Sequence, residues 1–331
     1  MRNFGYIRSE SPSETSQMLT GMDGADVIAG GTTLLDLMKL HVETPSTLID
    51  IKRMPLADIT VSAGGEVGIG AMVTNTQLAV HPHIRQNYPV LSQAILKGAT
   101  QQIRNMATVG GNLMQRPFCP YFRDTHYPCN KRELGSGCPS IDGHNRGQAV
   151  LGTSASCIAT HPSDMAVALA ALEARVLLRD TGGTTRSLAI GEFYRMPGDD
   201  PRRETVLQKG ELIIGVQLPP LPAARRSSYR KVRDRSSYQH AVTSAAVVLG
   251  RGANGRIETA RVALGGVGTV PWRSPEAEAA LAGRQASDAV FAQAAEAATT
   301  GARAYSENGF KIDLITRTVS RTLRDTWEMT A

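Results

Sequence analysis

Apolar and polar positions alternate along the first third of the chain in a way that predicts strands followed by helices. Residues 25–31, ADVIAGG, are a short apolar run ending in two glycines, and residues 32–41 then repeat apolar side chains at helical spacing. A second apolar run at residues 46–54 predicts another strand. We therefore expect a small βαβ unit over residues 1–55.

The middle of the chain mixes the two periodicities. ITVSAGGEVGIGAMVT, residues 59–74, predicts a hairpin around Gly64 and Gly65, because two apolar runs flank a glycine pair. Residues 90–105 have the pattern of one helix. Further along, the pattern predicts a helix at residues 162–174 and strands at residues 175–180 and 212–218.

The last third follows a proline-rich segment, QLPPLPAARRSS at residues 217–228, which is typical of a linker. Residues 240–268 predict two strands joined by a turn rich in glycine and asparagine. Alanine-rich helices are expected from about residue 275 to the end.

Length and composition narrow the class of protein. The chain has 331 residues, 41% of them hydrophobic and 20% charged, which is typical of a globular protein with more than one core. We expect no export signal, since the first residues lack an apolar core, and no membrane insertion, since Glu173 and Arg175 interrupt the most apolar helix. The net charge is +6, but the basic run at residues 225–235 contains Asp234 and lacks a recognition motif, so no nucleic-acid partner is expected.

All four cysteines lie within 39 residues of a loop rich in proline and glycine: Cys119, Cys129, Cys138 and Cys157. Structural disulfides suit small secreted domains, and this chain is large. A zinc ion would bind four thiolates, although such sites usually bring cysteines in close CxxC pairs. An iron–sulfur cluster also binds four thiolates and tolerates wider spacing. The spacing favours a cluster, then zinc, then unliganded thiols.

Other side chains of this loop could take part in such a site. The basic residues that would offset the thiolate charge are Arg116, Arg123, Lys131 and Arg132. The histidines that could replace a thiolate are His126, His144 and His161.

Two Gly-Gly segments are candidates for a phosphate site. IAGGTTLLDLMK, residues 28–39, places glycines where a strand turns into a helix, so that backbone N–H groups converge on one point. QQIRNMATVGGNLMQ, residues 101–115, contains a second pair between Thr108 and Asn112. Neither is the GxGxxG motif of Rossmann nucleotide domains. These segments are equally compatible with two interpretations. In one they hold a dinucleotide between subdomains, and in the other they are two unrelated turns.

Four segments in order, AGGTTLL, VGIGAMVTNTQL, QIRNMATVGGNL and THPSDMAVALAAL, resemble the FAD-binding subunit of the xanthine dehydrogenase family of molybdenum hydroxylases. YRKVRDRSSYQHAVTSAAVVL and GFKIDLITRTVSRTL are similar to that subunit's C-terminal domain. The cysteine loop resembles the branch that carries an extra [4Fe–4S] cluster, as in periplasmic aldehyde oxidoreductases.

The resemblance implies an α+β fold: a two-subdomain FAD-binding fold of the PCMH/CO dehydrogenase flavoprotein type, followed by a small C-terminal α/β domain with an antiparallel sheet and helices. It implies a βαβ subdomain at residues 1–55, a second FAD-binding subdomain at residues 56–222 with the cysteine loop inserted at residues 115–157, and a C-terminal domain at residues 223–331.

The resemblance also implies site residues. Thr33 departs from the family pattern, in which aspartate often follows Gly-Gly-Thr. The implied [4Fe–4S] ligands are Cys119, Cys129, Cys138 and Cys157. The implied FAD-binding residues are Val27, Ile28, Ala29, Gly30, Gly31, Thr32, Thr33, Leu34, Leu35, Thr108, Gly111, Asn112, Asp164, Ile213 and Lys231, with Ile213 against the isoalloxazine.

The function implied is electron transfer within a molybdenum-dependent aldehyde oxidoreductase. Electrons would pass from a large molybdenum-cofactor subunit, through two [2Fe–2S] clusters of a small subunit, to FAD and an external acceptor. No acid–base pair stands out, so no catalytic residue is expected on this chain. A periplasmic location by co-export with a signal-bearing partner is expected, with a cytoplasmic location as the alternative. Two other readings are a stand-alone flavoprotein oxidoreductase with structural zinc, and a non-enzymatic assembly subunit.

Overall fold

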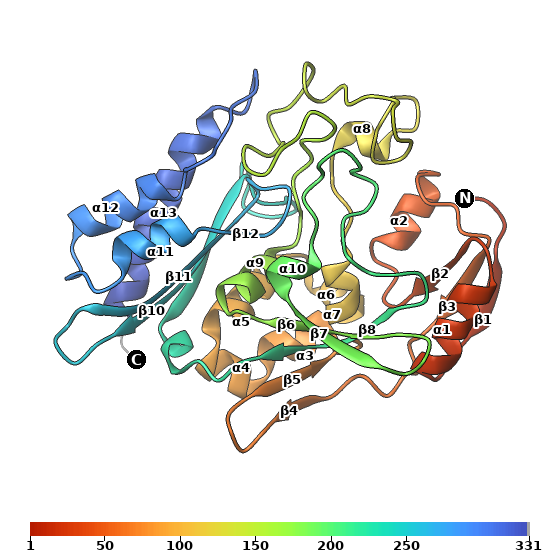
Figure 1. The fold of residues 1–331 in the computed structure, drawn as a ribbon, viewed down its shortest axis with the longest axis horizontal. Helices are drawn as coiled ribbons and strands as arrows, with labels where there is room; N and C mark the ends of the chain where they lie inside the picture. The colour runs from red at the N-terminus through yellow and green to blue at the C-terminus, as the bar shows by residue number, and fades with distance from the viewer. Residues whose placement is uncertain (330–331) are drawn as a thin grey trace.

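Three sheets follow one another along the chain in the computed structural model, which describes residues 1–329 (Figure 1). The first sheet lies at one end of the molecule and the third at the other, with the second between them (Figure 1). The region expected to end at residue 331 is therefore described up to residue 329. No helix within residues 1–329 has the length and apolar character needed to cross a membrane.

The first sheet is parallel, with strand order β1-β3-β2. The predicted strand–helix–strand pattern is confirmed, but the sequence pattern missed one strand and one helix before it. The missed strand has the sequence GYIR, in which three of four residues are exposed, so no apolar run marks it. The elements are β1 (Gly5–Arg8), α1 (Pro12–Gly21), β2 (Ala25–Ile28), α2 (Leu34–Lys39) and β3 (Thr47–Asp50).

The second sheet is antiparallel, with order β4-β5-β8-β6-β7. The predicted β4–β5 hairpin is confirmed, and Gly65 takes a φ of +83° at its turn, which favours glycine. The strands of this sheet are β4 (Ile59–Val61), β5 (Val67–Gly70), β6 (Arg175–Arg179), β7 (Thr185–Ala189) and β8 (Leu212–Leu218). The helices of this region are α3 (Asn75–Val80), α4 (Pro82–Asn87), α5 (Pro89–Leu96), α6 (Gln101–Met106), α7 (Val109–Leu113), α9 (Asp164–Ala171) and α10 (Ile190–Phe193).

The single helix expected at residues 90–105 is wrong. The chain forms two helices there, because α5 ends before Gly98 and a new helix starts after Thr100. The Thr100 side chain accepts a hydrogen bond from the Ile103 N–H at 3.3 Å, which caps the start of α6. This break directs α6 toward the turn that carries the second glycine pair.

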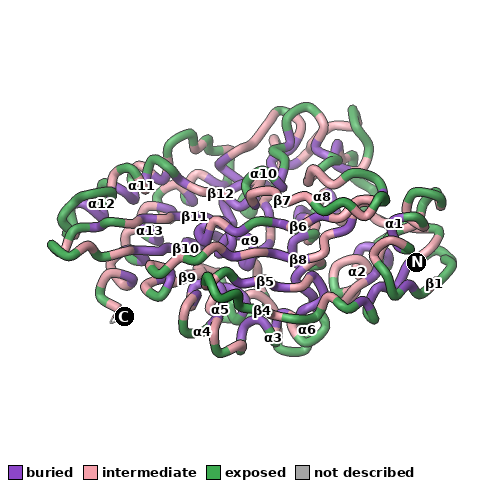
Figure 2. The backbone as a smooth tube through the Cα atoms, turned by 60° about the horizontal axis from the view of Figure 1, so that its bottom comes forward, coloured by how far each residue is buried: buried purple, intermediate pink, exposed green. Residues whose placement is uncertain are grey.

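The third sheet is antiparallel, with order β12-β11-β10-β9, and its hairpin and following helices are as predicted. All residues of α9 are buried, and the core around it includes Ala246 and Ala263 of the third sheet, so the second and third regions share a core (Figure 2). The elements are the 3-10 helix η1 (Pro222–Arg225), β9 (Ser227–Val232), β10 (Thr243–Arg251), β11 (Ile257–Gly265), β12 (Trp272–Arg273), α11 (Pro275–Leu281), α12 (Asp288–Ala297) and α13 (Phe310–Glu328).

The cysteine loop crosses the top of the molecule in Figure 1 and contains one short helix, α8 (Pro120–Arg123). Its end is held by the C-terminal region. Leu151 forms a parallel β-bridge with Gly268, and the Val150 N–H donates to the Val267 carbonyl at 2.8 Å. The buried Lys311 amine of α13 donates to the carbonyls of Gly147, Gln148 and Gly266 at 2.8–2.9 Å.

Candidate functional site: two cavities and a cysteine cage

A cavity of about 470 Å³ lies between the first sheet and the second, and we call it the glycine-lined cavity. Both glycine pairs line it, one after β2 and the other in α7. The two turns are in direct contact. A Cβ atom on Gly30 would lie 2.0 Å from the Met106 carbonyl oxygen, so only glycine fits there. The two segments that the sequence left unconnected therefore form one wall.

Some residues that line this cavity have backbone N–H groups without a protein acceptor among the described residues. Within residues 1–329, the N–H groups of Thr32, Thr33 and Leu34 donate no hydrogen bond to another protein group. Such a run of free N–H groups is suited to bind a phosphate or another anion. On the opposite turn, Thr108 caps α7 by accepting a hydrogen bond from the Gly111 N–H at 3.2 Å.

Charged side chains at one edge of the cavity were not assigned to it from the sequence. The Arg116 guanidinium donates to the Glu43 carboxylate at 2.6 Å and to the Glu204 carboxylate at 3.0 Å. Burial raises the pKa of Asp26 and of Glu43, although Arg116 acts on both in the opposite direction. These contacts join residues up to 88 positions apart, so no local pattern could reveal them.

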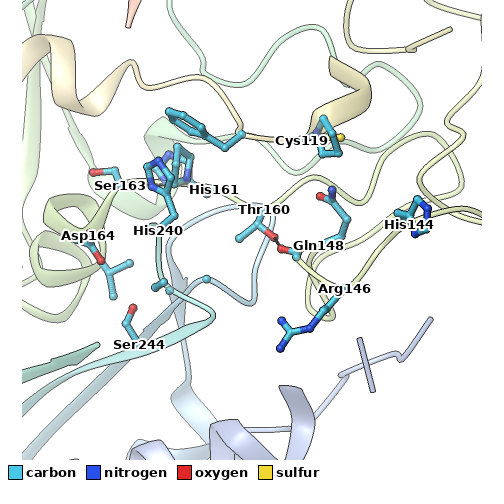
Figure 3. Close-up of a pocket in the computed structure, with 18 residues that line it drawn as sticks. Cys119, His144, Arg146, Gln148, Thr160, His161, Ser163, Asp164, His240 and Ser244 are labelled. Carbon is cyan, nitrogen blue, oxygen red and sulfur yellow. Dashed lines mark hydrogen bonds between the residues drawn. The ribbon is translucent and has the colours of Figure 1, made fainter. Parts of the chain in front are cut away.

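A second cavity of about 220 Å³, the histidine cavity, lies between the cysteine loop, α9 and the third sheet. Figure 3 shows His161, His240, Ser163 and Asp164 to one side of it and His144, Arg146 and Gln148 to the other. The His240 ring packs on Phe118 with 4.0 Å between ring centroids. Burial lowers the pKa of His161 to about 4, so its imidazole is neutral near pH 7.

The four cysteines converge on one small cavity, which we call the cysteine cage: Cys119, Cys129, Cys138 and Cys157. All four are free thiols, and Cys119 and Cys157 are buried. The Cys157 sulfur accepts a hydrogen bond from the Ala159 N–H at 3.4 Å. Burial raises the pKa of Cys119 and Cys138, and that of Cys157 to about 11. Within residues 1–329, no three His, Cys, Asp or Glu side chains form a ready-made site for a metal ion.

The cysteine cage adjoins the glycine-lined cavity. Leu37 of α2 lines that cavity and also packs in the same buried cluster as Cys119 and Cys157. An ion pair between Arg123 of α8 and Asp36 of α2 joins the loop to the same helix. On the other side, the Arg116 guanidinium lies 4.9 Å from the centre of the Phe122 ring, and Phe122 lines the cage.

Comparison with known proteins agrees with this arrangement. Residues 2–221 match the family described as "FAD binding domain in molybdopterin dehydrogenase", and residues 227–325 match the "CO dehydrogenase flavoprotein C-terminal domain". The chain is 48% identical over 325 residues to the aldehyde oxidoreductase FAD-binding subunit PaoB of Escherichia coli, covering 98% of both chains. This chain belongs to the FAD-binding subunits of the molybdenum hydroxylases.

More distant relatives of this FAD-binding subunit support the same assignment. The glyceraldehyde dehydrogenase medium chain of Sulfolobus acidocaldarius is 26% identical over 285 residues, covering 86% of this chain and 83% of that one. A solved structure of carbon monoxide dehydrogenase from Hydrogenophaga pseudoflava superposes with a TM-score of 0.76 at 25% identity, covering 100% of this chain and 99% of that chain. The resemblance to the xanthine dehydrogenase family, the expected α+β fold and the expected role as an oxidoreductase subunit are confirmed.

The FAD-binding subunit places most of its expected cofactor residues together. Ile28 and Leu35 lie behind the wall in a small apolar cluster, and the buried Asn112 amide oxygen accepts a hydrogen bond from Ser163 Oγ at 2.6 Å. The residues that line the glycine-lined cavity directly are Val27, Ala29, Gly30, Gly31, Thr32, Thr33, Leu34, Thr108, Gly111 and Ile213.

Asp164 and Lys231 lie elsewhere. They form a buried ion pair, with 2.7 Å between the Lys231 amine and the Asp164 carboxylate, and Asp164 lines the histidine cavity. The Tyr229 hydroxyl donates a second hydrogen bond to the same carboxylate. The structure therefore brings these two expected residues together but outside the lining of the glycine-lined cavity.

Proposed function

We propose that this FAD-binding subunit also holds a [4Fe–4S] cluster in its cysteine cage and transfers electrons within a molybdenum-dependent aldehyde oxidoreductase. The observation that carries the proposal is the convergence of four free thiols on one cavity that adjoins the glycine-lined cavity. FAD accepts electrons singly from iron–sulfur centres and releases them in pairs, so the two groups together would link one-electron and two-electron carriers.

The cage suits a cluster in its donor chemistry. Its donors are thiols held on a loop with two bends at Gly135 and Gly137, both with positive φ. A backbone N–H already points at the Cys157 sulfur, and the buried Lys131 lines the same cavity. Hydrogen bonds to sulfur and nearby positive charge both favour thiolate ligation and lower the energy of a negatively charged cluster.

FAD would bind with its pyrophosphate against Thr32, Thr33 and Leu34, whose free N–H groups offer donors. Ile213 would pack against the flavin from β8, where it is partly buried. The chain's own residues thus supply orientation and exclude water. Oxidation of the aldehyde would take place on a large molybdenum-cofactor subunit, with a small [2Fe–2S] subunit as the third member of a heterotrimer.

The aldehyde as substrate class follows from the 48% identity to the E. coli aldehyde oxidoreductase subunit over nearly the whole of both chains. We also propose that the complex is periplasmic, carried there by a partner that bears an export signal. Fractionation of cells that produce the three subunits together would test this, because removal of the partner's signal should move this chain from the periplasm to the cytoplasm.

The cluster is tested with Cys129→Ser in the co-produced heterotrimer. We expect a loss of about four iron atoms per complex and of one EPR signal in the reduced protein, with FAD and molybdenum contents unchanged. Thr125→Ala, at an exposed position on the same loop, is the matched control and should leave the iron content unchanged. An unchanged iron content in Cys129→Ser would contradict the proposal.

A further inference from the structure

Four charged side chains connect the two sites in an unbroken series, and of these Lys131 is buried while the other three are half-buried. Glu43 pairs with Arg116 at 2.6 Å, Arg116 with Glu204 at 3.0 Å, and Glu204 with Lys131 at 2.9 Å. The series begins at the wall of the glycine-lined cavity, where Glu43 and Arg116 lie, and ends at the cysteine cage, where Lys131 lies. Two cations and two anions make it electrically neutral as a whole.

Lys131 is the charged member nearest to the cage. Only 7% of its side chain is exposed, so solvent screens its charge poorly. Its amine also donates to the Pro201 carbonyl at 2.9 Å, which fixes the amine in place. Lys131 lines the cage and, together with Cys157 and Glu204, a second small cavity beside it.

Glu204 is the counter-ion that limits the effect of Lys131. Burial acts to raise the pKa of Glu204, but Lys131 and Arg116 outweigh it and hold the pKa below its ordinary value, so the carboxylate is ionised at neutral pH. Arg195 lines the same small cavity, and the neighbouring His161 is neutral near pH 7. Lys131 and Glu204 line this small cavity together with Cys157, so the Glu204 carboxylate offsets part of the field that the Lys131 amine exerts at the cage.

We infer that Lys131 and Glu204 act as an opposed pair that sets the reduction potential of the redox group in the cysteine cage. This rests on the proposed cluster. Reduction adds one electron, and so one negative charge, to a group beside a buried cation. Lys131 stabilises that added charge, and Glu204 opposes it. Neither residue binds the group, so both act by position and charge.

Lys131 and Glu204 differ in the other charged side chains that they contact. A change at Glu204 removes the counter-ion that Lys131 and Arg116 share and leaves Arg116 with Glu43 alone, whereas a change at Lys131 leaves both ion pairs of Arg116 in place. A change at Lys131 should therefore shift the reduction potential of the group in the cage far more than that of the flavin. A change at Glu204 should shift both potentials.

The test is a reductive titration of the purified heterotrimer with dithionite, following the EPR signal that Cys129→Ser removes. In Lys131→Gln the midpoint potential should fall, and in Glu204→Gln it should rise. Each shift should be at least a tenfold change in the ratio of reduced to oxidised cluster at fixed potential, or about 59 mV for one electron. The double variant should lie between them, and Lys131→Arg should stay close to wild type.

The outcomes separate this inference from the proposed function. If wild-type complex lacks the iron and the signal, the proposed cluster is wrong. If the signal is present but both variants leave its potential unchanged, or shift it in the same direction, the opposed-pair inference is wrong and the cluster stands. Should Lys131→Gln fail to assemble, Glu204→Gln alone still decides, because a purely structural role gives no reason for an upward shift.

Discussion

The glycine-lined cavity and the cysteine cage are neighbours that are built in opposite ways. The cavity takes its shape from backbone, since its two glycine turns pack together without side chains and present N–H groups. The cage takes its shape from side chains on a loop with little regular structure, and its thiols depend on packing by Phe122 and Leu37. A site made of backbone is fixed as soon as its strands and helices form, whereas a site made of loop side chains depends on everything that holds the loop.

The largest effect is expected from a substitution that disrupts the glycine-lined cavity alone. In Gly30→Val, the new side chain would meet the Met106 carbonyl, which belongs to the backbone and cannot rotate away. We expect at least a tenfold loss of FAD per chain, measured by flavin absorbance, with the iron that we propose for the cage retained. Gly64→Ala is the control, because its Cβ would meet only the Ser62 hydroxyl at 3.7 Å. Normal flavin content in Gly30→Val would contradict the contact between the two turns.

The second largest effect is expected from a substitution that disrupts the cysteine cage. Phe122 is fully buried between the thiols and Arg116, so Phe122→Ala removes a large side chain and leaves a hole, which typically lowers the free energy of unfolding by about 3–5 kcal/mol. When the complex is warmed, we expect the proposed cluster to lose its iron before FAD is released. The two losses are measured from the cluster absorbance and from the flavin absorbance. Phe122→Leu, which fills more of the space, should lose less. Simultaneous release of iron and FAD would show that the two sites are not separable.

A third, smaller effect concerns the anchor of the loop. Burial, with Arg146 acting in the same direction, lowers the pKa of Lys311 to about 7, while in the unfolded chain it is about 10.4. Between these values the unfolded chain binds more protons, so the free energy of unfolding should rise with pH above 7, by at most about 1.4 kcal/mol per unit.

Urea unfolding of the wild type and Lys311→Met at pH 7 and pH 9.5 measures this. Both tryptophans, Trp272 and Trp327, lie in the C-terminal region and report on it by fluorescence. The wild type should gain stability relative to the variant as pH rises. A difference that stays constant, or shrinks, would show that Lys311 keeps its proton throughout this range.

The smallest effect concerns the Thr108 cap of α7 at the glycine-lined cavity. Thr108→Ala removes the side-chain cap of α7 and should lower the free energy of unfolding by about 1 kcal/mol, with a severalfold weaker retention of FAD on dilution. Thr108→Ser keeps the hydroxyl and should behave as wild type. Equal FAD retention in all three proteins would mean that the cap does not hold the turn in its binding shape.

The sequence predicted the two sites unequally. The glycine turns are local, so the strand, turn and helix around Gly30 and Gly31 were all expected, and the cysteines marked the loop. The Arg116–Glu204–Lys131 contacts were not expected, because they join positions 70 or more residues apart and depend on how the loop folds back. The division of residues 90–105 into two helices was also missed, since apolar spacing continued through Gly98 while the capping by Thr100 acted locally.

The route of the chain imposes an order of assembly. The end of the cysteine loop is held by a bridge to Gly268 and by the amine of Lys311, and Lys311 belongs to the last helix. During synthesis these partners emerge from the ribosome long after the four thiols. The end of the loop can thus be held only after the segment that carries Lys311 has been made, so the four thiols stay on an unanchored loop until then.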